Sequence, residues 1–363
     1  LEVVEVFEFL KLGVFEVLEV FGLVGFVQEL RVELELQFPR RPRLVTDCIE
    51  VEGVEKRFGR VHAVRDLSLS IPMGSLCGFL GPNGAGKSTT IRMIMSIIRP
   101  DAGSLRVLDG DALDRKDRIG YLPEERGVYR KMKVGEYLTY IGRLKGIDTP
   151  TLRRRVADWL ERVELPDVQR RKCEELSKGM QQKVQFLAAI IHDPELIILD
   201  EPFSGLDPVN AQLLNDLIRG LHAEGRTILF STHVLHQAER MCDRIVLIDR
   251  GTKVLDENLD SIRSRFDPRT ITAEPDGDVT AWADSIRRVA GVESVDVEPS
   301  GRVHARLADD ADSRHVMTEC LAAGPVRSIE RARTTLDEVF FSLVGRRADH
   351  VESPTPEEAT IHG

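Results

Sequence analysis

Hydrophobic and polar residues alternate along two early segments, 48–54 and 64–71, which predicts strands with one solvated face. Three later segments, 76–80, 196–199 and 227–232, are short and centred on consecutive apolar residues, which predicts strands that are buried on both faces. Strands of this kind belong to parallel sheets whose two faces are covered by other elements. The pattern therefore predicts an α/β fold with a central sheet.

Between residues 80 and 196 the spacing of apolar residues changes to a helical period, because Val134, Leu138 and Ile141 fall on one face of a helix. Further helices are expected downstream of it, over residues 152–163 and 183–191. Together they predict an α-helical subdomain of about residues 124–190, inside a larger domain of residues 45–260.

The remaining chain predicts a small ferredoxin-like α+β domain, to which we assign residues 265–346. A last helix over 335–344 carries Leu336, Phe340 and Leu343 on one face. We expect the domain to serve dimer contact or regulation. Its predicted elements are strand, helix, strand, strand, helix and strand, over residues 269–273, 279–289, 292–297, 303–307, 313–323 and 326–331.

Both ends of the chain differ from the rest in composition. Residues 1–44 are dominated by Val, Leu, Phe and Glu and contain no Ala, Ile, Ser, Thr, Asn or Asp. We expect them to be a non-native upstream extension, with the protein beginning near Val45; an amphipathic helix on a membrane or partner is the alternative. Residues 347–363 are polar and contain prolines, so disorder is expected there.

The overall composition limits the possible functions. A chain of 363 residues with 42% hydrophobic content is long enough for two or three domains. The formal net charge of −10, without a basic cluster, argues against a nucleic-acid partner. No segment approaches the roughly 18–20 apolar residues of a membrane span. Neither a disulfide framework nor a zinc site is indicated by the widely spaced Cys48, Cys77, Cys173, Cys242 and Cys320, so a reducing cytoplasm fits.

A glycine-rich motif follows the apolar segment 76–80, and a helix is expected directly after it. Glycines allow successive backbone N–H groups to surround an anion, and a helix N-terminus adds its dipole. The lysine supplies a charge for the β and γ phosphates, and the next serine supplies a hydroxyl for Mg²⁺. A nucleoside triphosphate site is therefore predicted at Gly81-Pro82-Asn83-Gly84-Ala85-Gly86-Lys87-Ser88-Thr89.

Two carboxylates, Asp200 and Glu201, follow the apolar segment 196–199. Burying them costs free energy unless they have a role, and the carboxyl edge of a parallel sheet is where sites form. Asp200 is suited to hold Mg²⁺ through water, and Glu201 to polarise a water for attack on the γ phosphate. His233 follows the next buried strand at the same edge, where we expect it to contact the γ phosphate.

Two features have two interpretations each when they are taken alone. Phe58 fits either a core aromatic residue or a flat face on which an adenine ring stacks, and its spacing favours the core. Ser177 fits either an ordinary N-cap of a polar helix or, with the backbone of Gly179, a second anion site at the helix N-terminus.

Taken together, these motifs resemble the nucleotide-binding subunit of an ATP-binding-cassette (ABC) transporter, over about residues 49–259. The resemblance implies a P-loop NTPase cassette, with a mixed sheet core and an α-helical subdomain, that binds ATP and Mg²⁺. It implies that Phe58 stacks on adenine, that Glu201 is the general base and that His233 senses the γ phosphate.

The same resemblance implies a site shared between two subunits. The phosphate loop of one subunit and the signature residues Ser177 and Gly179 of a second would enclose ATP, so that ATP binding closes a homodimer or a paired cassette. Asp207, which ends the motif Ser-Gly-Leu-Asp, would lie in the nucleotide site as well.

Two positions depart from the family pattern. Glu124 stands where the family usually has Gln, and its carboxylate can still contact Mg²⁺ or its water. The signature over 176–181 is Leu-Ser-Lys-Gly-Met-Gln, whereas Leu-Ser-Gly-Gly-Gln is commoner. Ser177 and Gly179 are retained, so closure on ATP should survive.

The C-terminal part is similar to the short tail domain of export-type cassette subunits, such as those serving drugs, sodium or other small solutes. The expected function is therefore that of an ATPase that drives an export-type transporter through separate integral membrane permease subunits, at the cytoplasmic face of the cell membrane. The alternative is a soluble ABC-family ATPase acting on ribosomes or DNA. The chain has one cassette and no long coiled-coil or zinc insert, which favours the transporter.

Overall fold

The computed structural model describes residues 47–125 and 127–348, which form sheets of six, four and three strands. The extension expected over 1–44 lies outside the described residues, as does the expected tail beyond residue 348. No helix of the described part is long and apolar enough to cross a bilayer.

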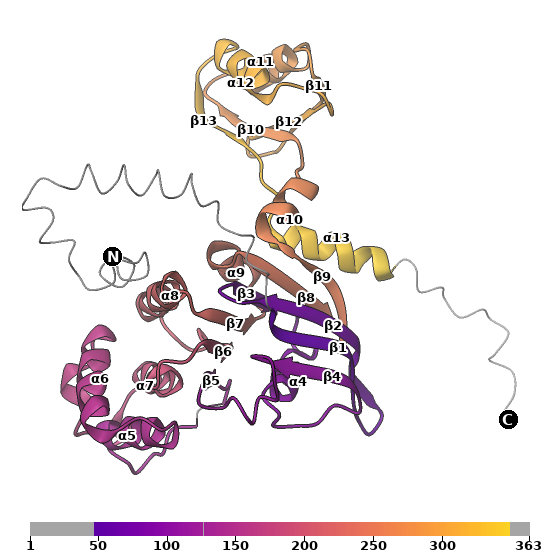
Figure 1. Cartoon of the computed structure of the whole chain (residues 1–363). Coiled ribbons are helices and arrows are strands. Elements are labelled where there is room, and N and C mark those ends of the chain that lie inside the picture. The colour runs from indigo at the N-terminus through magenta and orange to yellow at the C-terminus, as the bar shows by residue number, and fades with distance from the viewer. Residues whose placement is uncertain (1–46, 126, 349–363) are drawn as a thin grey trace, which may run out of the picture. The chain divides into compact units, whose positions relative to one another are not determined.

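The six-stranded sheet is the centre of the α/β domain (Figure 1). Its order is β5-β6-β7-β3-β8-β9, and all neighbours are parallel except β8 and β9. Side chains such as Leu80, Leu199 and Phe230 are completely buried, as the apolar runs predict. The strands are β3 (Leu76–Leu80), β5 (Ile119–Leu122), β6 (Leu196–Asp200), β7 (Thr227–Thr232), β8 (Arg244–Asp249) and β9 (Thr252–Asn258).

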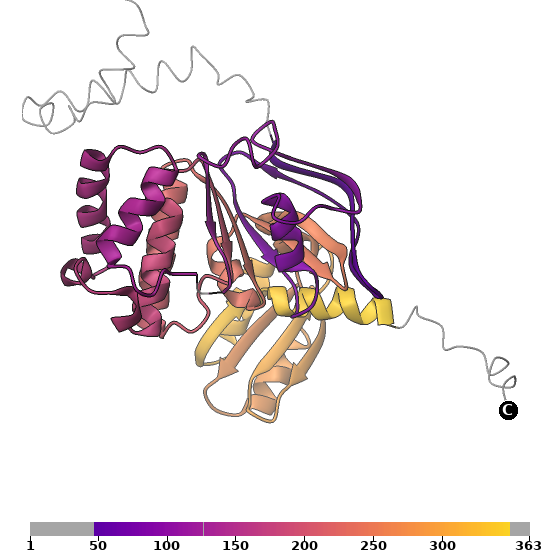
Figure 2. The same ribbon diagram turned by 90° about the horizontal axis from the view of Figure 1, so that it is seen from below.

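A second, antiparallel sheet of order β2-β1-β4 packs near the first, and helix α4 (Lys87–Ile94) lies between the two (Figure 2). Ile91 and Ile94 of α4 share one hydrophobic cluster with Val51 of the second sheet and Phe79 of the first. This packing holds the start of α4 next to the end of β3. The strands of the second sheet are β1 (Asp47–Phe58), β2 (Val61–Pro72) and β4 (Ala102–Val107).

Helices form a second hydrophobic cluster on the other side of the central sheet (Figure 1). The signature helix begins at Lys178, five residues before the predicted start, because Ser177 caps it and its first turns are polar. The helices are α5 (Val134–Leu144), α6 (Thr149–Arg162), α7 (Lys178–Ile190), α8 (Pro208–Ala223) and α9 (Leu235–Met241), with 3₁₀ turns η1 (Pro166–Val168) and η2 (Cys173–Glu175).

The C-terminal sheet has the antiparallel order β11-β12-β10-β13, which is the ferredoxin-like arrangement and confirms the predicted fold. Trp282, Ile286, Val316 and Cys320 from its two helices are buried against one face of the sheet. The elements are β10 (Thr270–Pro275), α11 (Val279–Ile286), β11 (Val292–Val297), β12 (Val303–Leu307), α12 (Ser313–Ala322) and β13 (Val326–Arg331).

Two helices flank this small sheet in the sequence, α10 (Leu259–Arg265) and α13 (Leu336–Ala348). Leu336 and Val339 of α13 are buried in the hydrophobic cluster of the α/β domain, against α9, and not in the core of the ferredoxin-like sheet. The predicted apolar face of α13 thus packs on the α/β domain. The helix also continues to Ala348, so it includes the first two residues of the expected tail.

Candidate functional site

The glycine-rich loop joins β3 to α4 in a conformation that only glycine adopts easily. Gly84 and Gly86 have φ values of 81° and 103°. A Cβ atom on Gly86 would lie 2.5 Å from the carbonyl oxygen of Ala63, and one on Gly81 would overlap the carbonyl oxygen of Ile248. The backbone of neighbouring strands therefore lies too close to the loop for a side chain at position 81 or 86.

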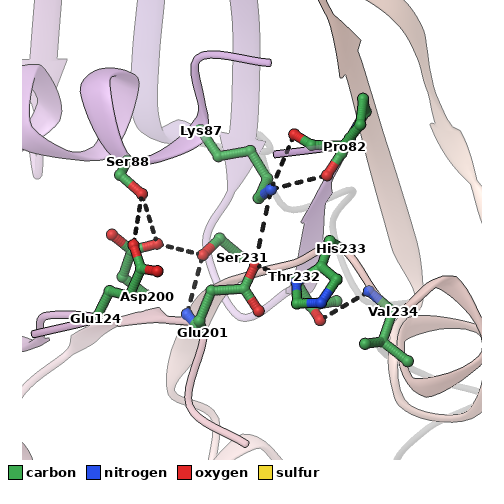
Figure 3. A network of polar contacts seen from close by, with 11 residues as sticks. Pro82, Lys87, Ser88, Glu124, Asp200, Glu201, Ser231, Thr232, His233 and Val234 are labelled. Carbon is green, nitrogen blue, oxygen red and sulfur yellow. Dashed lines mark hydrogen bonds and ion pairs between the residues drawn. The ribbon is translucent and has the colours of Figure 1, made fainter. Parts of the chain in front are cut away.

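Lys87 is the first residue of α4 and is 6% exposed (Figure 3). Its Nζ donates hydrogen bonds to the carbonyl oxygens of Gly81 at 2.7 Å and Pro82 at 3.3 Å. The same atom lies 3.6 Å from Glu201 Oε1. The loop thus directs a buried cation towards the end of β6.

Three side-chain oxygens that could bind a metal ion lie close together beside the loop (Figure 3). Ser88 Oγ lies 3.3 Å from Asp200 Oδ1 and 3.5 Å from Glu124 Oε2. Ser88 is the second residue of α4, Asp200 ends β6 and Glu124 follows β5, so the sheet brings together residues from three distant segments. Two carboxylates and a hydroxyl fit Mg²⁺ that also takes ligands from phosphate and water. The described residues contain no group of three or more His, Cys, Asp or Glu side chains that could hold a metal alone.

Asp200 is 1% exposed, and burial raises the pKa of its carboxyl above the ordinary value. Hydrogen bonds from Ser231 and Ser88 offset part of that rise. Ser231 Oγ donates to Asp200 Oδ1 at 2.5 Å and accepts from the backbone N–H of Glu201 at 3.1 Å. The sequence patterns did not indicate Ser231, although a serine within the buried segment 227–232 was an available signal.

Glu201 is 8% exposed and lies between a lysine and a histidine. Its Oε1 is 3.0 Å from His233 Nδ1, in addition to its contact with Lys87. Glu201 follows β6 and His233 follows β7, and these strands pair in parallel with Asp200 opposite Ser231. The structure therefore brings together Lys87, Ser88, Glu124, Asp200, Glu201 and His233 (Figure 3).

The signature residues form a separate group. Ser177 Oγ accepts a hydrogen bond from Met180 N at 3.3 Å and caps α7, while Gly179 packs near Leu206 and Asn210. Asp207 caps α8 by accepting from Asn210 N at 2.9 Å, and its bonds to Asn210 hold the pKa of Asp207 below the ordinary value. Within residues 47–125 and 127–348, no hydrogen bond or ion pair joins these residues to the phosphate loop.

Phe58 ends β1 and is 50% exposed. The interpretation of Phe58 as a core residue is therefore wrong. Lys56 Nζ lies 5.6 Å from the centroid of its ring, so the ring already has one cationic neighbour. A flat, accessible aromatic face at the end of a strand is available for stacking.

The site combines a glycine-rich loop, between a central strand and a helix, with carboxylates and a histidine at the ends of nearby strands of the same sheet. This combination defines a P-loop ATPase. A family model described as ABC transporter matches residues 64–204. A second, described as the C-terminal domain of DrrA1-3-like ATP-binding proteins, matches residues 258–344.

Several curated proteins are similar to this chain over nearly their whole lengths. An uncharacterized ABC transporter ATP-binding protein of Bacillus subtilis is 38% identical over 299 residues, covering 82% of this chain and 98% of that protein. The daunorubicin/doxorubicin resistance ATP-binding protein of Streptomyces peucetius is 33% identical, covering 84% and 94%. The Nod factor export ATP-binding protein I of Ralstonia nicotianae is 33% identical, covering 83% and 95%.

Solved structures lead to the same class. The ATP-binding subunit of an ABC transporter aligns with a TM-score of 0.57 and 31% identity, over 60% of this chain and 93% of that one. A dimeric bacterial ABC transporter cassette aligns with a TM-score of 0.54 and 26% identity, over 58% and 98%. The chain therefore belongs to the family of ABC transporter ATP-binding proteins, which bind and hydrolyse ATP, and the resemblance inferred from the motifs is confirmed.

Proposed function

We propose that this chain hydrolyses ATP to drive an export-type transporter through separate integral membrane permease subunits, at the cytoplasmic face of the membrane. The observation that carries the ATPase part of the proposal is the position of Glu201, whose Oε1 lies 3.0 Å from His233 Nδ1 and 3.6 Å from Lys87 Nζ. The export branch is supported by the match of the C-terminal domain and by the relatives named for drug resistance and Nod factor export.

The backbone and side chains of the glycine-rich loop hold the phosphates of ATP in this proposal. The loop residues are those from Gly81 to Thr89, including Asn83 and Ala85, and the dipole of α4 adds to their effect. Lys87 exchanges its contact with Glu201 for one with the γ phosphate, which leaves the glutamate free to contact water. Phe58 stacks on the adenine ring, because its ring is half exposed at the end of β1.

Ser88, Asp200 and Glu124 hold Mg²⁺, directly or through water, by the three oxygens that converge beside the loop. Bound Mg²⁺ neutralises charge that develops on the β and γ phosphates. Asp200 keeps its position through Ser231, which also fixes the backbone of Glu201.

Glu201 acts as the general base that accepts a proton from the attacking water. His233 makes the contact with the γ phosphate, and its bond to Glu201 orients the carboxylate. Ser177, Gly179 and Asp207 act on the nucleotide of a second copy, since they have no bond to the phosphate loop of their own chain within the described residues. Two copies would then form two composite sites.

The substitution Glu201→Gln tests the role of the base. It keeps the size of the side chain but removes its basicity, so we expect kcat to fall by roughly 10²- to 10⁴-fold while ATP binding is kept. The measurements are steady-state ATPase rates and the retention of labelled ATP by a dimer on gel filtration. Glu161→Gln, at an exposed position of α6, is the control and should retain the parental rate. Parental turnover by the Glu201→Gln protein would refute the assignment.

Co-purification tests the coupling to a membrane partner. We expect the tagged chain to be recovered from detergent-solubilised membranes together with an integral membrane protein, and its ATPase rate to respond to that protein in vesicles. Recovery on ribosomes without a membrane partner would instead establish the soluble class of ABC ATPases.

A further inference from the structure

Helix α7 starts at the signature and then enters the hydrophobic core, where its residues 182–190 are buried. Two of these buried residues are glutamines one helical turn apart, Gln182 and Gln185, which are 3% and 4% exposed. Buried amides cost free energy unless they form hydrogen bonds. Their bonding partners therefore indicate why they are there.

Both amides bind backbone carbonyls of loops that carry site residues. Gln185 Nε2 donates to the carbonyl oxygen of Glu125 at 3.1 Å and to that of Pro123 at 3.4 Å. These two carbonyls lie directly before and after Glu124. Gln182 Nε2 donates at 3.0 Å to the carbonyl oxygen of Pro202, the residue after Glu201. One helix thus holds the two loops through two separate residues.

The loop that carries Glu124 has few other polar contacts, and Glu125 adds only an exposed ion pair, with Arg92 Nη2 3.9 Å from its Oε1. Strand β5 ends at Leu122, and no backbone–backbone hydrogen bond joins Glu124 or Glu125 to another described residue. The carboxylate of Glu124 touches Ser88 Oγ only at 3.5 Å, and both glutamates are exposed. The position of Glu124 therefore depends on how its backbone is held.

We propose that Gln185 is a positioning residue that keeps Glu124 at the metal site. Its amide clamps the backbone on both sides of Glu124, so that the carboxylate remains beside Ser88 and Asp200. The proposal rests on the proposed function, because the value of this position is the binding of Mg²⁺ with ATP. Since Ser177 caps the start of α7, the clamp connects the signature of each chain to its own metal site.

The test compares Gln185→Met with Gln182→Met, which makes the same change in the same helix at equal burial. In nucleotide-free protein, hydrogen exchange at the amides of Glu124 and Glu125 should become faster in Gln185→Met alone. The dissociation constant for Mn²⁺ in the presence of a non-hydrolysable ATP analogue, measured by electron paramagnetic resonance, should rise roughly fivefold in Gln185→Met, as expected for the loss of about one hydrogen bond. It should stay within about twofold of the parent in Gln182→Met.

A double-mutant cycle with Glu124→Gln distinguishes positioning from general destabilisation. If Gln185 acts through Glu124, Gln185→Met should weaken Mn²⁺ binding little further once the carboxylate is gone. Fully additive effects, or equal effects of Gln182→Met and Gln185→Met on Mn²⁺ binding, would overturn the proposal. Failure of the parental chain to bind the ATP analogue would refute the proposed function instead, and unchanged loop exchange in Gln185→Met would still refute the clamp.

Discussion

Glu201 combines a chemical role with an unfavourable backbone conformation. Its φ is 48°, in the left-handed region that costs a residue with a side chain about 1–2 kcal/mol. The backbone N–H of Glu201 is held by both the hydroxyl and the carbonyl oxygen of Ser231. The neighbouring strand thus imposes the turn that directs the carboxylate of Glu201 towards Lys87 and His233.

Substitutions at Gly86 and Gly84 distinguish the cost of a steric clash from the cost of backbone strain in the phosphate loop. In Gly86→Ala the new Cβ would meet the carbonyl oxygen of Ala63, so we expect a loss of about 2–4 kcal/mol in the free energy of unfolding. At Gly84 the φ is also positive, but no atom lies within 4 Å of the added Cβ. Gly84→Ala should therefore lower the free energy of unfolding by only about 1 kcal/mol. Urea unfolding measures both. Equal losses in the two variants would contradict this view of the loop.

Helix α13 supports the part of the ATPase domain that follows His233. Helix α9 begins at Leu235, two residues after that histidine, and α13 packs against it. The backbone N–H of Leu336 donates to Glu239 Oε2 of α9 at 3.4 Å. Removing the C-terminal part would therefore expose apolar side chains of the ATPase domain as well as remove an accessory domain.

The two faces of α13 provide a matched pair of substitutions. Leu336 is 4% exposed, so Leu336→Ala should lower the free energy of unfolding by about 2–4 kcal/mol through the cavity it leaves. Phe341 is 71% exposed, and Phe341→Ala should change it by no more than about 0.5 kcal/mol. Chemical denaturation followed by circular dichroism checks both values. A neutral Leu336→Ala would mean that α13 does not contribute to the folded core.

The two halves of the proposed nucleotide site lie on one chain without a bond between them in the described part. A symmetric dimer would complete each site with residues from the other copy. Mixing two inactive variants tests this arrangement. Lys87→Ala disables the phosphate loop and Ser177→Arg the signature, so a mixed dimer retains one intact site.

We expect the mixture to hydrolyse ATP, although neither variant does so alone. ATPase rates of the separate and mixed proteins, with light scattering to verify dimers, give the answer. A mixture as inactive as its components, despite verified mixed dimers, would argue that each chain forms its site alone.

Stability of the whole molecule should depend on pH through His192, which is 5% exposed. Burial, with a contribution from Lys145, lowers the pKa of His192 from 6.5 to about 4, and its Nε2 lies 3.1 Å from the carbonyl oxygen of Ile119. Between pH 6.5 and 4 the unfolded chain therefore binds a proton that the folded protein excludes. Above pH 6.5 both states are neutral, and the stability is fully present.

As the pH decreases from 6.5 to 4, His192 should lower the free energy of unfolding by up to about 3 kcal/mol. His192→Gln removes the titrating group, so its curve of stability against pH should be flatter than that of the parent. The difference between the two proteins, measured by urea unfolding at several pH values, isolates His192 from the carboxylates. Parallel curves would show that His192 is not held neutral.

Local patterns were sufficient for much of the fold. The limits of β3 and β7 and the order of the ferredoxin-like elements follow from consecutive or periodic apolar residues. The core interpretation of Phe58, which the spacing alone favoured, was wrong because Phe58 lies at the exposed end of β1, and spacing along a strand does not reveal which of its positions are covered. The start of α7 was placed too late because its first turns are polar and a single N-cap, Ser177, sets the beginning.

The main residues of the candidate site could be predicted from the sequence. A phosphate loop is a contiguous motif, and carboxylates at a strand end are recognisable from the apolar run before them. The sequence did not specify that Ser231 holds Asp200, that Gln185 holds the loop of Glu124, or that α13 covers α9. These contacts join residues that are far apart in the chain. Their geometry depends on sheet register and on how helices pack, and neither leaves a local pattern.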